Sequence, residues 1–162
     1  MKSKKNIKLP LTSTEKTHLR KHKIKIADVL NYASDELEIL LNTTSERAKE
    51  IHALAQFQTI PSIGIKFAED LVFLGYHSLN ELKSKNGAIL TDEYEEKKGY
   101  RIDPCVEDQF RLVVHYAKTK DLTKNWWDFT EERKQYRLKH GYPATRPGNA
   151  WHQTIAYKRT NS

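Results

Sequence analysis

The stretch that decides the fold is Ile60-Pro61-Ser62-Ile63-Gly64-Ile65-Lys66-Phe67-Ala68-Glu69-Asp70-Leu71, in which a Pro/Gly hairpin opens directly into a helix. Gly64 can take backbone conformations that strain other residues, and the amides of Gly64, Ile65 and Lys66 fall where a helix offers no internal acceptors. The positive end of the helix dipole favours an anion there, and Lys66 adds a full charge. The stretch therefore predicts a phosphate site, with the Ser62 hydroxyl as a further donor.

The order of residue types in this stretch resembles the helix-hairpin-helix motif, in which two helices flank a short hairpin that grips a DNA backbone. Ala68 fits the motif, because the two helices approach each other closely. Ser62 departs from it, since the family usually has the first glycine of its hairpin at that position. The resemblance implies DNA binding and a monovalent cation held by carbonyl groups of the hairpin. The alternative is an ordinary helix N-terminus that binds nothing.

Positive charge is the main feature of the composition. The 28 Lys and Arg residues outnumber the 21 Asp and Glu residues, which gives a formal net charge of +7. Such an excess favours polyanions as charged partners. A hydrophobic share of 38% is enough for a helical core. The length of 162 residues fits one compact domain or two small, closely packed modules.

Signals for targeting and for disulfide bonding are weak. The segment Met1–Lys8 is basic but has no apolar run behind it, and no stretch is apolar enough to cross a membrane. We therefore expect a cytoplasmic protein that does not associate with membranes. Cys105 is the only cysteine, which excludes an internal disulfide and a cysteine-based zinc cluster.

The apolar spacing and the capping residues predict an all-α fold with four consecutive parts. Residues 1–11 form a basic flexible tail, and residues 12–57 form a helical lead-in. Residues 58–140 hold the hairpin and the helices after it, packed as one domain with the lead-in. Residues 141–162 form an extended tail, which Trp151 docks, because prolines and a glycine interrupt any helix there. The expected helix caps are Thr12 or Ser13, Ser34, Thr44 or Ser45, Ser78, Asp103 and Thr130.

The first half of the chain repeats part of the second at an offset of 20 residues. The matched pairs are Thr44 and Gly64, Ala48 and Ala68, Ile51 and Leu71, and Leu54 and Leu74. Residues 42–45 then form a first hairpin, which has hydroxyl groups in place of glycines and should bind phosphate weakly at most. The sequence therefore predicts a compact helical domain with tandem helix-hairpin-helix-like units, the second well formed and the first degenerate.

Charged residues after the hairpin have two interpretations. The acidic run Asp92–Glu96 is typical of a solvated helix face of mixed charge. Lys97, Lys98 and Arg101 follow it closely, and these three residues could instead form a basic rim that contacts DNA.

Catalytic and metal-binding patterns are weak. A thiol near a helix N-terminus, as at Cys105, can have a lowered pKa. His115 lies ten positions along the same helix, which is about 15 Å by helical rise, so it cannot serve Cys105 as a base. His18 and His22 are spaced for one ion but lack a third ligand nearby. We predict a protein without catalytic residues, metal site or organic cofactor, with a thiol- or metal-dependent enzyme as an alternative.

Two later motifs make the resemblance more specific. Asp103-Pro104-Cys105-Val106 is followed by Phe110-Arg111 and by Trp126-Trp127-Asp128-Phe129-Thr130-Glu131-Glu132-Arg133. Together with the hairpin, these motifs resemble the small bacterial pathogenicity-locus family, also called Cdd, over about residues 55 to 137. The resemblance implies a bacterial source and a likeness to helix-hairpin-helix proteins of DNA metabolism. One ring of the Trp126/Trp127 pair should anchor the last helix, and the alternative is a stacking platform for an unpaired base.

The combined expectation is a non-enzymatic protein that binds duplex or branched DNA through its backbone, with little base reading, in DNA repair or recombination. The alternative is a protein-interaction module that keeps the helical scaffold but has lost DNA binding. Its partner would then be a DNA-repair protein.

Overall fold

The computed structural model describes residues 6–154 as a succession of helices, and these residues contain an isolated bridge between Arg101 and Ala150 but no β-strand. The predicted all-α class is confirmed. The chain divides into two compact units, Met1–Glu81 and Leu82–Ser162. Whether residues 12–140 behave as one domain stays a prediction.

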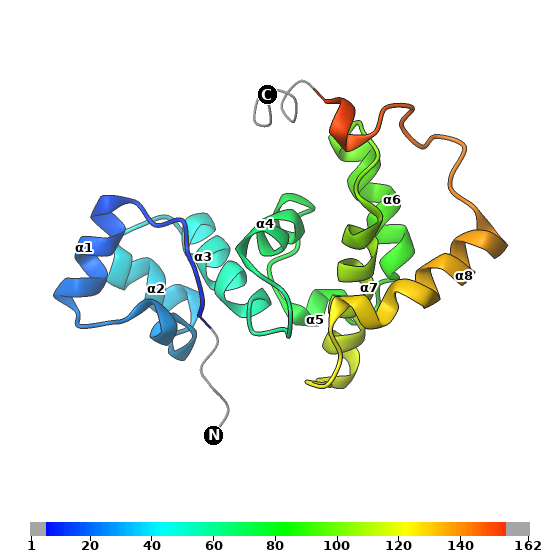
Figure 1. The fold of residues 1–162 in the computed structure, drawn as a ribbon. Coiled ribbons are helices and arrows are strands. Elements are labelled where there is room, and N and C mark those ends of the chain that lie inside the picture. The colour runs from blue at the N-terminus through cyan, green and yellow to red at the C-terminus, as the bar shows by residue number, and fades with distance from the viewer. Residues whose placement is uncertain (1–5, 155–162) are drawn as a thin grey trace. The chain divides into compact units, whose positions relative to one another are not determined.

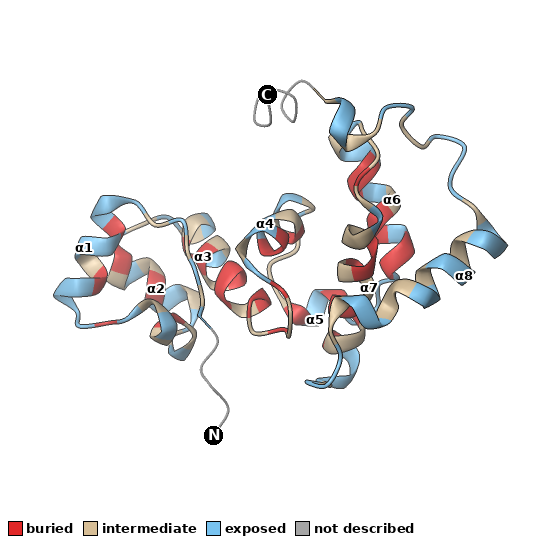
Figure 2. Ribbon diagram, in the orientation of Figure 1, coloured by how far each residue is buried: buried red, intermediate tan, exposed pale blue. Residues whose placement is uncertain are grey.

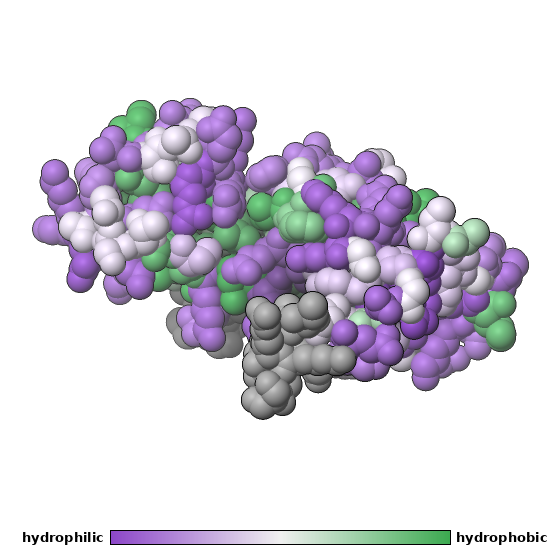
Figure 3. All heavy atoms as spheres, turned by 90° about the horizontal axis from the view of Figure 1, so that it is seen from above, coloured by the Kyte–Doolittle hydropathy of each residue, from purple (hydrophilic) through white to green (hydrophobic). Residues whose placement is uncertain are grey.

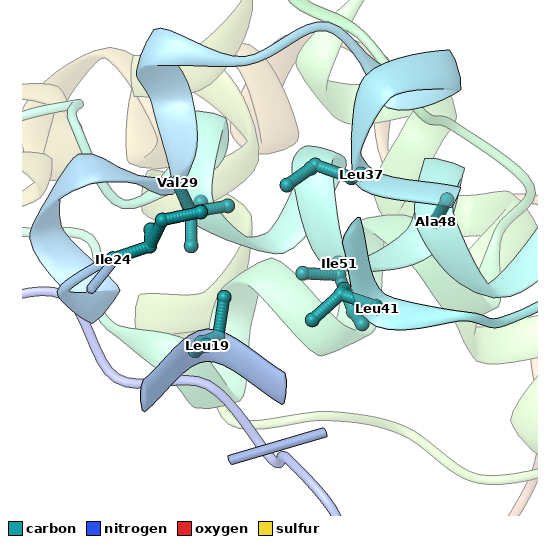
Figure 4. Packing of buried hydrophobic residues seen from close by; sticks show 8 residues of the cluster. Leu19, Ile24, Val29, Leu37, Leu41, Ala48 and Ile51 are labelled. Carbon is teal, nitrogen blue, oxygen red and sulfur yellow. The ribbon is translucent and has the colours of Figure 1, made fainter. Parts of the chain in front are cut away.

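The first unit is built from short helices (Figure 1), and those within residues 13–57 share an apolar core cluster. In chain order they are α1 (Ser13–Lys21), the 3₁₀ helix η1 (Ile26–Asn31), α2 (Ser34–Leu41), α3 (Ser45–Phe57) and α4 (Ile65–Phe73), with α5 (Leu79–Leu82) at the boundary. Figure 4 shows side chains from α1, η1, α2 and α3 pointing toward one another, among them Leu19, Val29, Leu37 and Ile51. Each fully buried aliphatic side chain of this kind contributes about 1.5–3 kcal/mol.

The segment before α1 packs on this core instead of forming a tail. Ile7, Leu9 and Leu11 lie against the core cluster, and Lys8 exchanges two backbone hydrogen bonds with the Gln58 side chain, of 3.0 and 2.7 Å. The prediction of a flexible tail is therefore wrong for residues 6–11, because alternate apolar residues there find a surface to cover. Residues 1–5 of the predicted tail lie outside the described residues.

Most of the predicted caps are present. The Glu15 amide donates to Thr12 Oγ1 at 3.1 Å, and the Thr12 amide donates to Glu15 Oε1 at 2.9 Å. Thr44, Ser78 and Asp103 also cap their helices, since each side chain accepts a first-turn amide.

Two of the predicted caps are wrong. Ala33 precedes α2, and its amide donates to Glu36, so Ser34 lies inside the helix. Thr130 is the first residue of α8, and its hydroxyl donates to Asp108 at 2.8 Å instead of capping.

The second unit contains α6 (Gly87–Lys98), α7 (Pro104–Thr119), the 3₁₀ helix η2 (Trp126–Phe129), α8 (Thr130–His140) and the 3₁₀ turn η3 (Trp151–Gln153). Helices α6 and α7 lie side by side, and buried residues concentrate on their facing sides (Figures 1 and 2). The approach is close at Gly87, where an added Cβ would lie 2.7–2.9 Å from Arg111 atoms, including backbone. A glycine is therefore required there by packing.

Helix α8 has no buried residue and is held by ion pairs. Arg133 Nε lies 2.6 Å from Asp108 Oδ1, and Arg137 Nη2 lies 2.8 Å from Glu107 Oε1. Both carboxylates are almost fully buried. Removing one partner of a buried pair is costly, because the other charge stays in a low-dielectric site. The arginines of α8 therefore fix its position on α7.

The acidic run is not the solvated face that the sequence predicts. Glu95 is only 1% exposed, and its carboxylate contacts Arg146 at 2.9 Å and accepts the Ile102 amide at 2.8 Å. Tyr94 is buried as well. The prediction is wrong at these two positions, because the residues after α8 fold back and cover Glu95, while the Tyr94 ring packs against Phe110 of α7 with 5.7 Å between ring centres.

Residues 141–154 are largely irregular, with the short turn η3 near their end, and they contact the rest of the second unit. Arg146 pairs with Glu95, and the backbone of Arg101 bonds to Asn149 and Trp151. Docking by the Trp151 side chain stays a prediction, and residues 155–162 of the predicted tail lie outside the described residues.

The face drawn in Figure 3 is mainly hydrophilic, with hydrophobic residues between the charged ones. Exposed hydrophobic residues that are scattered singly need no special explanation.

Candidate nucleic-acid interface

The hairpin between α3 and α4 is anchored by two buried side chains. Ile60 and Ile63 are both fully buried, and the Ile63 amide donates to the Ile60 carbonyl at 3.2 Å. This hydrogen bond closes a turn with Pro61 and Ser62 at its centre. Proline at the first central position suits a type II turn, which needs a positive φ at the second.

Ser62 supplies that positive φ, with a value of 61°. The left-handed region costs a residue with a side chain about 1–2 kcal/mol relative to the right-handed one. Ser62, where the sequence departs from the helix-hairpin-helix motif, therefore lies at a position whose backbone conformation favours glycine.

Gly64 does not have the strained conformation that the sequence suggests. It precedes the first residue of α4 with φ −106° and ψ −172°, which is extended backbone open to any residue. An added Cβ at Gly64 would meet nothing within 4 Å. The expectation is wrong because the left-handed step of the turn falls at Ser62, two residues earlier. The empty space beside Gly64 leaves the start of α4 open to a ligand.

Among the longer helices, α4 has the fewest hydrogen-bond partners for its first-turn backbone amides. Among described residues, the amides of Gly64, Ile65 and Lys66 make no hydrogen bond, and no side chain caps the helix. Gly64 and Lys66 are exposed, while Ile65 and Ser62 are half-buried. The four predicted site residues thus lie together at one helix N-terminus, with one cationic side chain and no acidic residue in the first turn.

The first hairpin is shorter, with three residues between α2 and α3 against seven between α3 and α4, and its chemistry is opposite. Asn42 matches Ser62 and also has a positive φ, of 50°. Thr44 matches Gly64 as the N-cap, yet its hydroxyl accepts the Arg47 amide at 3.1 Å. Glu46, two residues after Thr44, occupies the position that matches Lys66 in the second hairpin. A capped start with a carboxylate disfavours phosphate.

The matched positions of the two copies are equally buried in the helices themselves. Ala48, Ala68, Ile51 and Leu71 are all fully buried. Leu74 breaks the pattern, because it is half-buried and follows α4 as its C-cap, whereas Leu54 is buried inside α3.

The predicted basic rim belongs to the second unit. Lys97 and Lys98 lie in the last turn of α6, and the Lys98 Nζ is 5.7 Å from the centre of the Tyr94 ring. Arg101 Nη2 donates to the Gly148 carbonyl at 3.0 Å, so this side chain helps to hold the C-terminal segment. DNA contact by the rim stays a prediction.

Cys105 is not an activated thiol. Burial and a hydrogen bond with Asp103 raise its pKa to about 12, so the side chain stays protonated near neutral pH. His115 instead contacts Asp121, with 3.2 Å between Nε2 and Oδ2.

No group of three or more metal-ligating side chains occurs within residues 6–154. His18 and His22 line a shallow surface cavity without a third such ligand.

The tryptophan pair divides as the sequence suggests. Trp127 is 55% exposed and Trp126 is half-buried, and the two rings meet edge to face with 5.4 Å between their centres. The stacking alternative for Trp127 stays open to test.

The sequence analysis missed a basic cluster in the second unit. Arg111, His115 and Lys118 lie on one face of α7, and with Lys85 they line a cavity. Their spacing of four and then three residues was the available signal, because residues so spaced share a helix face.

Comparison with known proteins identifies a family. A family model described as "Cdd1: Pathogenicity locus" matches residues 50–135, which include the hairpin, α4, α6, α7 and the tryptophan pair. Searches of curated proteins and of solved structures found no match. No helix of the described residues is both long and apolar enough to cross a membrane.

Proposed function

The chain belongs to the Cdd1 pathogenicity-locus family, and from this premise we propose that it binds DNA without catalysis, gripping the phosphate backbone through its hairpin at Ser62–Lys66. One phosphate accepts hydrogen bonds from the backbone amides of Gly64, Ile65 and Lys66, and the Lys66 ammonium group adds a positive charge beside it. The Ser62 hydroxyl serves as a further donor. Contacts of this kind position a protein on DNA without reading bases. Duplex and branched DNA are both suitable ligands, in repair or recombination in the bacterial cytoplasm.

The observation that carries this proposal is the bare N-terminus of α4. Every other described α-helix of eight residues or more has a side-chain cap, an acidic residue in its first turn, or both. Helix α4 has neither and bears Lys66 instead. Unpaired amides, the helix dipole and a lysine all favour the same kind of ligand, an anion.

The test is fluorescence anisotropy with labelled single-stranded, duplex and forked DNA at several salt concentrations. Lys66→Glu should weaken binding to every sequence. On duplex DNA its slope of log K against log salt should be smaller by roughly 0.9 for each phosphate that the variant no longer neutralises. Lys49→Glu is the matched control, because Lys49 is also exposed in the first unit and the charge change is identical. An equal drop in affinity in both variants would refute the assignment of this site.

The alternative function is a protein-interaction module that has lost DNA binding, and Ser62 in a left-handed turn position favours it. A DNA-repair protein would be the partner. Absence of DNA binding in wild type, together with pull-down of such a protein, would favour this alternative. A monovalent cation at the hairpin carbonyls is a further proposal, and a change of affinity between potassium and tetramethylammonium salts at equal ionic strength would support it.

A further inference from the structure

The second unit contains a cavity of about 230 Å³ between the start of α6, one face of α7 and the start of α8. Its charged lining comes from three different parts of the chain. Lys85 lies in the loop before α6, Arg111 and Lys118 lie on α7, and Glu132 lies on α8. The imidazole of His115 also lines it.

The charge of this lining suits a dianion. Three cationic side chains and one carboxylate give a formal charge of +2 with neutral His115. A phosphomonoester carries about −1.5 to −2 near neutral pH, because its second pKa is about 6. A phosphodiester carries a single negative charge, so the lining matches a phosphate at a chain end better than one within a backbone.

The Arg111 side chain is held in a fixed position at this site. Its side chain is 10% exposed, and its Nε and Nη2 donate to Glu107 Oε2 at 3.1 and 2.9 Å. The position of the guanidinium is therefore fixed by a buried carboxylate. Nη1 makes no hydrogen bond with a described residue, and its nearest carboxylate oxygen is Glu132 Oε2 at 3.5 Å. A fixed guanidinium with free donors is well suited to a phosphate oxygen.

Glu132 occupies the position of a weak, replaceable anion. Its side chain is 60% exposed, and 3.5 Å is too long for a good charge-assisted hydrogen bond. Exposed ion pairs contribute about 0.2–1 kcal/mol, so an incoming dianion can displace this carboxylate at little cost.

The first-turn amides of Ala88 and Ile89 in α6 do not serve as donors to the anion, because they already donate hydrogen bonds to the Asn86 side chain at 2.8 and 3.3 Å. The side chains of Lys85, Arg111 and Lys118 carry the site. A volume of about 230 Å³ lies below the roughly 300–1,000 Å³ of pockets for drug-sized ligands, so the phosphate group of a ligand fits while the sugar and base of a nucleotide would lie outside the cavity.

We propose that this cavity is an anion site for a phosphomonoester, supplied either by the terminal phosphate of a nucleic-acid strand or by a mononucleotide. The proposal does not depend on the hairpin, since all lining residues belong to the second unit.

The experiment uses the full chain with Lys66→Glu as background, so that binding at the hairpin is reduced. A short single-stranded oligonucleotide labelled at its 3′ end is titrated with and without a 5′-phosphate, and deoxyadenosine 5′-monophosphate is the competitor. We expect tighter binding of the phosphorylated strand. Adding Lys118→Glu should weaken this binding by about tenfold, because a reversed charge acts directly on the phosphate. Glu132→Gln should tighten it by about threefold.

Lys83→Glu is the matched control, because Lys83 is exposed on the same loop as Lys85 but does not line the cavity. It should change binding by less than about twofold at moderate salt, where distant charges are screened. Competition by the mononucleotide as strong as that by the phosphorylated strand identifies the free nucleotide as the source. Weaker competition identifies the strand end.

Two results would overturn the proposal. The first is equal affinity for strands with and without the 5′-phosphate, together with no competition by the mononucleotide. The second is an equal effect of Lys118→Glu and Lys83→Glu. Failure of the hairpin assignment appears separately, as a Lys66→Glu variant that binds unphosphorylated duplex as wild type does.

Discussion

Gly64→Asp should separate the stability of α4 from its ability to bind DNA. Gly64 has the extended conformation of a capping residue, and the space where its Cβ would stand is empty. An aspartate can therefore enter without strain and accept the first-turn amides. Its carboxylate would stand where the phosphate is proposed to bind.

The two effects have opposite signs. An aspartate cap is better than glycine by a few tenths of a kcal/mol, and a carboxylate at the positive helix end adds about 0.3–1 kcal/mol. We expect a gain of about 1 kcal/mol in the free energy of unfolding. Loss of one hydrogen bond to an ionised group costs about 1.5–3 kcal/mol, so DNA affinity should fall by ten- to a hundredfold.

Urea unfolding and anisotropy on the same preparation check this pair of outcomes. Gly64→Asn is the control, because asparagine caps about as well but carries no charge. It should gain less stability and lose less affinity than the aspartate variant. A Gly64→Asp protein that is more stable yet binds duplex DNA as wild type does would refute the hairpin as the binding site. A less stable one would refute the geometric reasoning about position 64.

Four further predictions concern stability and reactivity. Gly87→Ala should lower the free energy of unfolding by about 1–3 kcal/mol in urea, because the new methyl group meets backbone atoms of α7. Ser62→Gly should raise it by up to about 1 kcal/mol, since the left-handed cost disappears while unfolded-state entropy offsets part of the gain. Cys105 should resist iodoacetamide at pH 8 in the folded protein and react once unfolded, because its pKa is raised to about 12. The hydrogen bond from Arg47 lowers the pKa of Glu15 below its usual 4.5, so this pair stabilises the fold above that pH. That contribution should disappear as the pH falls through the lowered pKa, and Glu15→Gln should remove this part of the acid sensitivity.

Each of these predictions has a direct contrary result. Gly148→Ala serves as the control for Gly87→Ala, because an added Cβ there meets nothing within 4 Å, and equal destabilisation would refute the packing argument. A destabilised Ser62→Gly protein would show that the serine side chain contributes more than the strain costs. Rapid alkylation of folded protein would contradict a protonated, half-buried Cys105. An acid unfolding profile unchanged by Glu15→Gln would place the acid sensitivity elsewhere.

Local signals in the sequence predicted much of the helical fold. Thr12, Thr44 and Asp103 begin helices because their side chains accept amides two or three residues ahead, and this requirement is visible in a few residues of sequence. Gly75 and Gly141 have positive φ at the ends of α4 and α8, which follows from the same local chemistry.

Contacts between residues far apart in the sequence could not be predicted from these local signals. Glu95 belongs to a run of charges that looks solvated, and only the return of the chain to Arg146, 51 residues later, buries it. The proposed role of Arg111 likewise depends on Lys85 and Glu132, which line the same cavity but come from other segments. The sequence shows that charges exist, but which of them meet depends on packing between distant helices.

The hairpin breaks local preference twice within three residues. Ser62 takes a backbone conformation that favours glycine, and Gly64 occupies a cap position where a hydroxyl would stabilise the helix by a few tenths of a kcal/mol and a carboxylate by about 1 kcal/mol. The first hairpin has better-suited residues at the two matched positions, because Asn42 tolerates the left-handed conformation well and Thr44 caps α3. A cap at position 64 would occupy the amides that a phosphate needs, so stability and binding exclude each other there. The proposed phosphate site would account for the lack of a side-chain cap on α4.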